Sequence, residues 1–196
     1  MIVDSEPLWE RADRIIVGME GKSYQTETKN NIMGLNPIDS VKELCRIHKI
    51  STAPEILLCR RENLMTEFYE KTVDLTNGAY EILEYLYDKG IKIALASSTP
   101  KRFFIKTLTK YKIDKFFKVI VTSEDVSKAK PDPEIFIKTS KLLDVPKKEI
   151  IIVEDSHAGV SAAISAGMTV LWLNKVHLQF SCKYIKKVVD ITKPAG

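Results

Sequence analysis

The feature that most constrains the fold is the alternation of short apolar runs with amphipathic segments after Gly78. Apolar runs at residues 91–96, 119–121, 150–153 and 169–173 predict strands. Segments with helical spacing lie between them, which is typical of a parallel sheet with helices on both faces. We therefore expect an α/β fold, a three-layer Rossmann-like core, in the second part of this 196-residue chain.

The segments between the apolar runs supply the helices of this core. The ranges with helical spacing are 80–88, 101–111, 133–143 and 158–166. Gly90 and Gly167 suit the ends of the first and last helices. Asp132 followed by Pro133 suits the start of the third helix.

The chain before Gly78 has a different pattern. Apolar residues recur at helical spacing over 8–16, 41–48 and 56–68, and no convincing strand precedes residue 75. Asp39 or Ser40 is a candidate N-cap of the middle helix, with Glu43 as the reciprocal capping-box partner of Ser40. This part therefore predicts a small helical bundle.

Composition narrows the class of protein. With 44% hydrophobic residues, the chain can bury a core for one domain, with or without a smaller insert. No stretch approaches 18 uncharged apolar residues, and the start lacks a basic region followed by an apolar run, so we expect neither a membrane span nor a secretory signal. The 30 basic residues outnumber the 26 acidic ones but are scattered, which favours a solvated surface over a nucleic-acid site.

The number and spacing of the cysteines indicate the cellular compartment of the protein. Cys45, Cys59 and Cys182 form no CxxC pair and are odd in number. This usage favours a reduced, cytoplasmic setting without structural zinc.

Polar residues follow the predicted strands, where sites of parallel sheets occur. An acidic pair, Glu154 and Asp155, comes after the third strand. Adjacent carboxylates repel each other unless a cation or hydrogen-bond donors compensate, and oxygen-only ligands suit Mg²⁺. The alternative is an acidic pair that interacts with the dipole of the following helix.

Two further groups follow other strands. Ser97 and Ser98 begin a turn whose hydroxyl and amides suit an anion. The alternative is an ordinary helix start, with Thr99 as the N-cap and Pro100 in the first turn. Lys130 lies in a proline-fixed loop that can aim its charge at a phosphate. The alternative for Lys130 is a solvated loop lysine.

In combination, the hydroxyl, the lysine and the acidic pair resemble the haloacid dehalogenase (HAD) superfamily. Residues 95–97 resemble its second motif, residues 130–136 its third, and residues 153–167 its fourth with the segment that follows. Residues 3–9 resemble the segment after the first motif. The resemblance covers nearly the whole chain and points to the subgroup with a helical cap, which includes β-phosphoglucomutase-like proteins and sugar-phosphate phosphatases.

The resemblance implies a domain division and roles for the motif residues. Residues 1–12 and 76–196 would form the HAD-like core and residues 13–75 the inserted cap. Phosphoryl transfer would proceed through an aspartyl-phosphate, with Ser97 and Ser98 binding phosphate and Lys130 as the catalytic, charge-neutralising residue. Mg²⁺ would be the cofactor, with Asp155 as a direct ligand and Glu154 bound directly or through water.

The family's first motif, a strand ending in Asp-x-Asp-Gly that carries the nucleophile, has no counterpart in this sequence. Asp4 resembles a later acidic position and is not the nucleophile. We expect the sequence to start at an internal methionine, with the nucleophile upstream; a naturally inactive homologue is the alternative. The strand implied to be missing lies in the middle of the sheet. Burial of its four or five apolar side chains, at about 1.5–3 kcal/mol each, would contribute a free energy comparable to the total stability of a domain, about 5–15 kcal/mol.

Residues in and next to the predicted cap help to decide between a phosphatase and a mutase. The mutase pattern places a histidine where this chain has Trp9, and an arginine after the cap glycine, where residues 34–39 offer none. We therefore expect a phosphatase of a small phosphorylated sugar or polyol. Arg60 and Arg61 are either substrate contacts or exposed helix charges. A β-phosphoglucomutase-type mutase and an inactive phospholigand-binding homologue are the alternatives; we expect a monomer without nucleic-acid or membrane partners.

Overall fold

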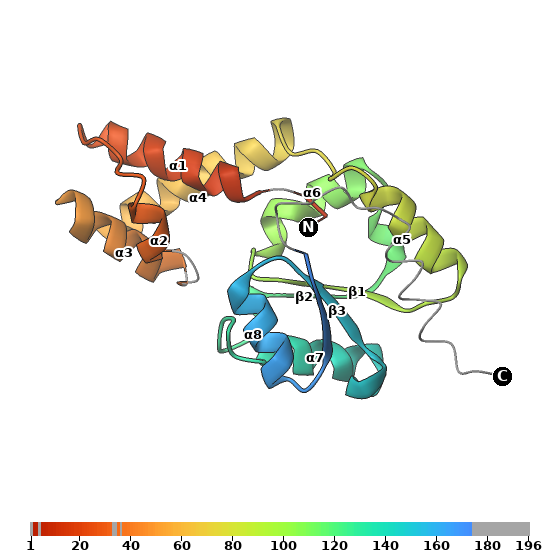
Figure 1. The fold of residues 1–196 in the computed structure, drawn as a ribbon. Coiled ribbons are helices and arrows are strands. Elements are labelled where there is room, and N and C mark those ends of the chain that lie inside the picture. The colour runs from red at the N-terminus through yellow and green to blue at the C-terminus, as the bar shows by residue number, and fades with distance from the viewer. Residues whose placement is uncertain (1, 4, 33–34, 36, 174–196) are drawn as a thin grey trace.

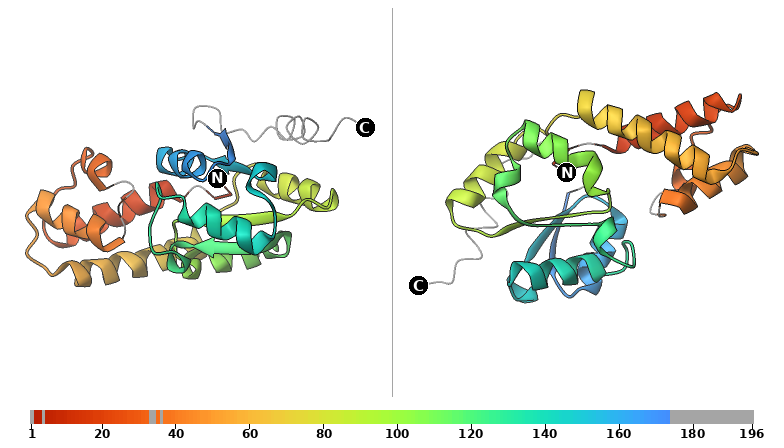
Figure 2. Two further views of the ribbon diagram at one scale, coloured as in Figure 1. Left: turned by 90° about the horizontal axis from the view of Figure 1, so that it is seen from below. Right: turned by 180° about the vertical axis from the view of Figure 1, so that it is seen from behind.

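The computed structural model describes residues 2–3, 5–32, 35 and 37–173, and Figure 1 shows a helical part beside an α/β part. Cys182 and Asp4 therefore lie outside the described residues. The helical part is elongated and projects from one side of the α/β part in both views of Figure 2. Its helices are α1 (Glu6–Met19), α2 (Thr28–Ile32), α3 (Pro37–His48) and α4 (Pro54–Lys71).

The α/β part confirms the predicted alternation. Helices α5 and α6 lie on one side of the strands and α7 and α8 on the other, which gives three layers (Figure 1). The strands are β1 (Ile93–Ser97), β2 (Phe117–Thr122), β3 (Ile151–Glu154) and β4 (Thr169–Trp172). The helices are α5 (Ala79–Asp88), α6 (Lys101–Lys110), α7 (Glu134–Leu143) and α8 (His157–Ser165), with 3₁₀ turns η1 (Asp114–Phe116), η2 (Ser123–Asp125) and η3 (Lys147–Glu149).

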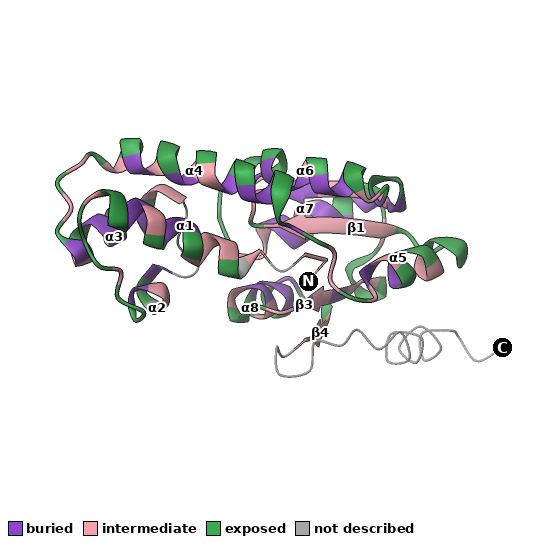
Figure 3. Cartoon of the chain, turned by 90° about the horizontal axis from the view of Figure 1, so that it is seen from above, coloured by how far each residue is buried: buried purple, intermediate pink, exposed green. Residues whose placement is uncertain are grey.

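The strands pair in parallel, as two separate pairs. β1 pairs with β2, with Ser97 opposite Thr122, and β3 pairs with β4, with Glu154 opposite Trp172. Among the described residues, no hydrogen-bonded ladder joins β1 to β3. Every residue of β1 is only half-buried, as its pink colour in Figure 3 shows.

Helix starts differ from the predictions in two places. Helix α3 begins at Pro37, so Asp39 and Ser40 lie inside it and the predicted capping box is wrong. Ser40 Oγ instead donates to the main-chain oxygen of Pro37 at 2.8 Å. Asp132 precedes the cap position of α7 by one residue, and its Oδ1 accepts a hydrogen bond from the Glu134 amide at 3.0 Å.

The helical part and the α/β part share a buried core. Met65, Phe68 and Tyr69 of α4 belong to the same buried cluster as Phe103 and Phe104 of α6. Helices α4 and α6 lie side by side with buried surfaces between them (Figure 3). The proposed cap of residues 13–75 stays a prediction, and α1 runs through its first boundary.

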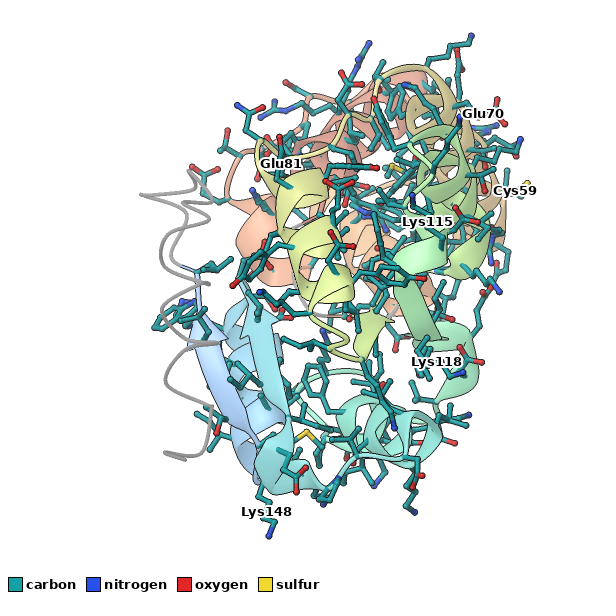
Figure 4. All side chains as sticks on the ribbon, turned by 90° about the vertical axis from the view of Figure 1, so that its right-hand side faces the viewer. Cys59, Glu70, Glu81, Lys115, Lys118 and Lys148 are labelled. Carbon is teal, nitrogen blue, oxygen red and sulfur yellow. The ribbon has the colours of Figure 1, made fainter. Side chains whose placement is uncertain are left out.

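The surface carries the scattered basic residues. Lys115, Lys118 and Lys148 are exposed on η1, β2 and η3, and Figure 4 shows them on different elements.

Cys59 is exposed and free, whereas Cys45 is buried and free. Within the described ranges, no helix is both long and apolar enough to cross a bilayer.

Candidate active site

One cavity contains all the site residues expected from the sequence. It has a volume of about 240 Å³ and lies where β1 and β3 end. The predicted residues that line it are Ser97, Ser98, Lys130, Glu154 and Asp155. The carboxyl ends of parallel strands meet at one edge, which is why residues up to 58 positions apart in sequence converge there.

The loop after β1 presents hydroxyl and amide groups to the cavity. The amide of Thr99 donates to Ser97 Oγ at 3.1 Å, which closes a tight turn at the strand end. Helix α6 has Pro100 at its N-cap and no side-chain capping bond, so Thr99 is not the cap that the alternative interpretation required. The turn therefore leaves its polar groups beside the cavity instead of using them to cap the helix.

Lys130 is buried rather than solvated. It is 8% exposed. Its Nζ donates to Glu154 Oε2 at 3.3 Å and to the main-chain oxygen of Ala96 at 3.5 Å. The charge also lies 4.8 Å from the centre of the Phe136 ring. A buried ammonium group beside a cavity attracts an anion more strongly than an exposed one, because water screens it less.

Glu154 is held by both of its oxygens. Oε2 contacts Lys130, while Oε1 accepts a hydrogen bond from Ser156 Oγ at 2.5 Å. Ser156 in turn caps α8 by accepting a bond from the Gly159 amide at 3.0 Å. A Cβ atom at position 159 would lie 2.0 Å from Glu154 Oε1, so only glycine leaves room for this carboxylate.

The donor set fits Mg²⁺ in part. Asp155 and Glu154 supply carboxylate oxygens at the cavity, and Mg²⁺ typically takes one or two carboxylates and completes its shell with waters and phosphate oxygens. No group of three His, Cys, Asp or Glu side chains that could hold a metal is found in the described part of the chain. The two carboxylates therefore provide part of a magnesium site.

The acidic residues after β2 do not join the cavity. Asp125 accepts hydrogen bonds from the amide and hydroxyl of Thr122, which lower the pKa of its carboxyl. Glu124 instead pairs with Arg102 at 2.6 Å. Both side chains are therefore occupied at the start of η2 and α6.

The two cap arginines make ion pairs inside the helical part. Arg61 is buried and forms a fork with Asp13, with Nε 2.8 Å from Oδ1 and Nη2 3.0 Å from Oδ2. Arg60 pairs with Glu20 at 2.7 Å. Neither arginine lines the described cavity. The Arg61 guanidinium also lies 4.9 Å from the Trp9 ring, and Trp9 does not line the cavity.

The cavity wall also contains residues that sequence reasoning did not single out, and Tyr69 is one of them. Tyr69 of α4 lines the cavity and is 3% exposed. Burial raises the pKa of its hydroxyl. In the sequence Tyr69 is simply one aromatic residue on the apolar face of a helix, which gives no reason to single it out.

Known proteins with a similar sequence point to one family. Residues 1–173 match the sequence model of the family described as haloacid dehalogenase-like hydrolase. A phosphorylated carbohydrates phosphatase of Thermotoga maritima is 32% identical over 168 residues, which cover 86% of this chain and 78% of the relative. A (DL)-glycerol-3-phosphatase of Arabidopsis thaliana is 27% identical over 87% of this chain and 60% of its own length.

Solved structures agree on the fold. The crystal structure of β-phosphoglucomutase from Clostridium difficile matches with a TM-score of 0.80 at 22% identity, covering 97% of this chain and 93% of that chain. CbbY from Rhodobacter sphaeroides, crystallised in complex with phosphate, matches with a TM-score of 0.78 at 20% identity, covering 92% and 86%. These likenesses support the three-layer arrangement.

Proposed function

Because the chain belongs to the haloacid dehalogenase-like hydrolase family, we propose that it is the binding and charge-stabilising part of a magnesium-dependent phosphatase acting on a small phosphorylated sugar or polyol. The observation that carries this proposal is the convergence of Ser97, Lys130 and Asp155 on one cavity. A hydroxyl, a buried cation and a carboxylate in that arrangement suit a phosphate monoester beside a divalent cation.

Each residue has a role set by its chemistry. Ser97 and the amide of Ser98 would donate to phosphate oxygens, while Lys130 would neutralise the charge of the transferring group. Asp155 and Glu154 would hold Mg²⁺, which supplies Lewis-acid stabilisation of the phosphate when bound. As the family resemblance implies, we assign Asp155 the direct contact and Glu154 the weaker or water-mediated one.

The nucleophile of the aspartyl-phosphate route is proposed to lie in a segment beyond the given sequence. The cavity's two acidic side chains, Glu154 and Asp155, are both assigned to the metal. The unjoined edges of β1 and β3 support a further strand between them, because each strand pairs with only one described neighbour. A strand in that position would end beside Lys130, where a carboxylate would be stabilised.

The relatives and the cavity's size support the proposed substrate class. The Thermotoga relative is named for phosphorylated carbohydrates and an Arabidopsis relative for glycerol 3-phosphate. A cavity of about 240 Å³ suits a small ligand better than a polymer. The phosphomutase alternative receives less support, because Trp9 packs edge-on against Phe103 at 5.7 Å in the position where mutases have a histidine.

Hydrolysis of p-nitrophenyl phosphate with and without Mg²⁺ tests the proposal. We expect little or no turnover by the 196-residue chain, and magnesium-dependent turnover after a strand ending in Asp-x-Asp-Gly is added before residue 1. A matched protein with Asn-x-Asn-Gly in the added strand controls for simple stabilisation. If the extended chain folds and binds phosphate but stays inert across a panel of sugar and polyol phosphates, the protein is a phospholigand-binding homologue instead.

A further inference from the structure

The loop that carries Lys130 has no regular secondary structure of its own. It runs from residue 126 to residue 133, between η2 and α7. Ser127, Lys128 and Ala129 in this loop are exposed, whereas Lys130 is buried beside the cavity. An exposed loop samples many conformations unless hydrogen bonds restrict it. The position of the Lys130 charge therefore depends on the contacts that hold the loop.

The Glu134 side chain ties the start of this loop to its end. Glu134 is the first residue of α7, and its carboxylate contacts two successive main-chain amides at the beginning of the loop. The Ser127 amide donates to Oε1 at 3.0 Å and to Oε2 at 3.1 Å, and the Lys128 amide donates to Oε2 at 2.8 Å. A carboxylate suits this position because both of its oxygens accept hydrogen bonds. Lys130 lies between the two points that Glu134 joins.

Other contacts restrict the segment between Ala129 and α7. The Asp132 amide donates to the main-chain oxygen of Ala129 at 3.0 Å, and the Glu134 amide donates to Asp132 Oδ1 at 3.0 Å. Two residues further along the chain, the Phe136 ring lies 4.8 Å from Lys130 Nζ. The Glu134 carboxylate adds the link that crosses Lys130, from α7 back to the beginning of the loop.

From these contacts we propose that Glu134 positions Lys130 for anion binding by fixing the loop that carries it. The inference rests on the proposed phosphate site and adds to it a residue whose side chain does not line the cavity. Glu134 is a positioning residue, because it acts on phosphate through the loop and Lys130. Its own negative charge opposes the binding of an anion nearby, so any favourable effect on phosphate has to come from the geometry of the loop.

Calorimetric titration of inorganic phosphate into the 196-residue chain with Mg²⁺, well below the melting temperature of each variant, tests the proposal. We expect Glu134→Gln to raise the Kd for phosphate about threefold to tenfold, because apparent affinity falls in proportion to the fraction of chains whose loop is ordered. Electrostatics alone predicts the opposite change, since the substitution removes a negative charge. A Kd equal to or lower than that of the wild type would overturn the role of Glu134.

Asp125→Asn is the matched control, because it removes the same charge from the turn just before the loop. Asp125 also holds main chain, since its Oδ2 accepts a hydrogen bond from the Thr122 amide at 2.8 Å, and it does not line the described cavity. We expect its Kd for phosphate to equal that of the wild type or to be slightly lower. An equal rise of the Kd in Asp125→Asn and Glu134→Gln would indicate a general loss of order and reject a specific role of Glu134.

Nuclear magnetic resonance of the Lys130 side chain tests the route. Protons above an aromatic ring resonate upfield, so the ε-methylene protons of Lys130, which lies over the Phe136 ring, should be upfield of those of the exposed Lys128. In Glu134→Gln the Lys130 signal should move toward that of Lys128, and in Asp125→Asn it should stay. A raised Kd without any change in the Lys130 signal would overturn the route through Lys130.

A second variant covers the case in which Glu134→Gln does not fold. Glu134→Ala places no amino group against the two amides of the loop, which lie at exposed residues and can bind water instead. It must also raise the Kd, and an unchanged Kd would reject the inference.

The outcomes separate the two proposals. A wild-type chain that binds phosphate, together with a Glu134 variant that binds equally well, rejects the role of Glu134 and keeps the phosphate site. A wild-type chain that binds no phosphate rejects the site itself and the role of Glu134 with it.

Discussion

Lys130 Nζ lies 3.3 Å from Glu154 Oε2, and the two side chains are only 7% and 10% exposed. Lys130 comes from the loop before α7 and Glu154 from the end of β3, so this ion pair joins two separate parts of the chain in the cavity wall. Buried charges are costly unless each is paired. The pair therefore keeps a cation beside the proposed phosphate position without leaving its charge uncompensated.

Breaking this pair should destabilise the protein. Lys130→Met leaves Glu154 buried without its cation, so we expect the free energy of unfolding to fall by about 3–5 kcal/mol. Adding Glu154→Gln removes the unpaired charge and should restore part of that loss. Urea denaturation of the single and double variants measures both effects.

Lys128 provides the control for Lys130. It lies on the same loop, is exposed, and contacts Asp132 at 3.7 Å. Lys128→Met should change stability by less than about 1 kcal/mol, as is typical of exposed pairs. Equal losses from the two lysine substitutions would contradict a structural role for the buried pair.

Gly159 should tolerate no side chain. Because its Cβ would lie 2.0 Å from Glu154 Oε1, Gly159→Ala must displace a carboxylate that Lys130 and Ser156 hold. We expect a loss of about 1–3 kcal/mol in unfolding free energy, as for other overpacked sites. Thermal and urea denaturation provide the measurement.

Gly18→Ala is the matched glycine substitution. Gly18 lies in α1, where an added Cβ would have no neighbouring atom within 4 Å, and its φ is not positive. Alanine there should stabilise the chain by about 0.5–1 kcal/mol, because glycine is a poor helix residue. The interpretation of Gly159 fails if both glycine variants shift stability in the same direction.

The sequence was sufficient to predict the α/β part and the convergence of its motifs. Apolar runs bounded by glycine and polar residues fix where β1 and β3 lie, and parallel strands bring Ser97 and Glu154 to one edge. The predicted strand and helix ranges there agree with the structure to within two residues at each end.

Contacts between distant residues were not predictable. Helix α2 has only five residues, too few to show a period, and α3 begins at Pro37, before the residues that were expected to cap it. The Asp13–Arg61 pair joins residues 48 positions apart, and Tyr69 reaches the cavity only because α4 packs on α6. Local pattern carries no information about such pairings.

Asp13 should contribute less to the stability of the protein as the pH rises. Burial raises the pKa of its carboxyl from 3.8 to about 6, although Arg61 opposes the shift. Between about pH 4 and pH 6 the folded chain therefore binds a proton that the unfolded chain has released. The contribution of Asp13 to stability must fall as the pH rises through this window.

The difference in unfolding free energy between wild type and Asp13→Asn measures that contribution at each pH. It should decrease from pH 4 to pH 6 and then level off. Asp125→Asn supplies a control of opposite sign, because hydrogen bonds from Thr122 lower the pKa of Asp125 and its contribution is lost as the pH falls. A wild-type minus Asp13→Asn difference that rises with pH would show that Arg61 outweighs burial.

Asp155 should carry most of the affinity for a divalent cation. In the proposed site it supplies the direct carboxylate oxygen and Glu154 the weaker or water-mediated one, so Asp155→Asn should weaken Mn²⁺ binding by at least about tenfold and Glu154→Gln by less. Electron paramagnetic resonance of free Mn²⁺, titrated into the 196-residue chain with inorganic phosphate present, gives the Kd values. Asp132→Asn is the control, because Asp132 lies on the Lys130 loop but does not line the cavity. Equal Mn²⁺ affinity in the Asp155→Asn and Asp132→Asn chains would remove Asp155 from the metal site.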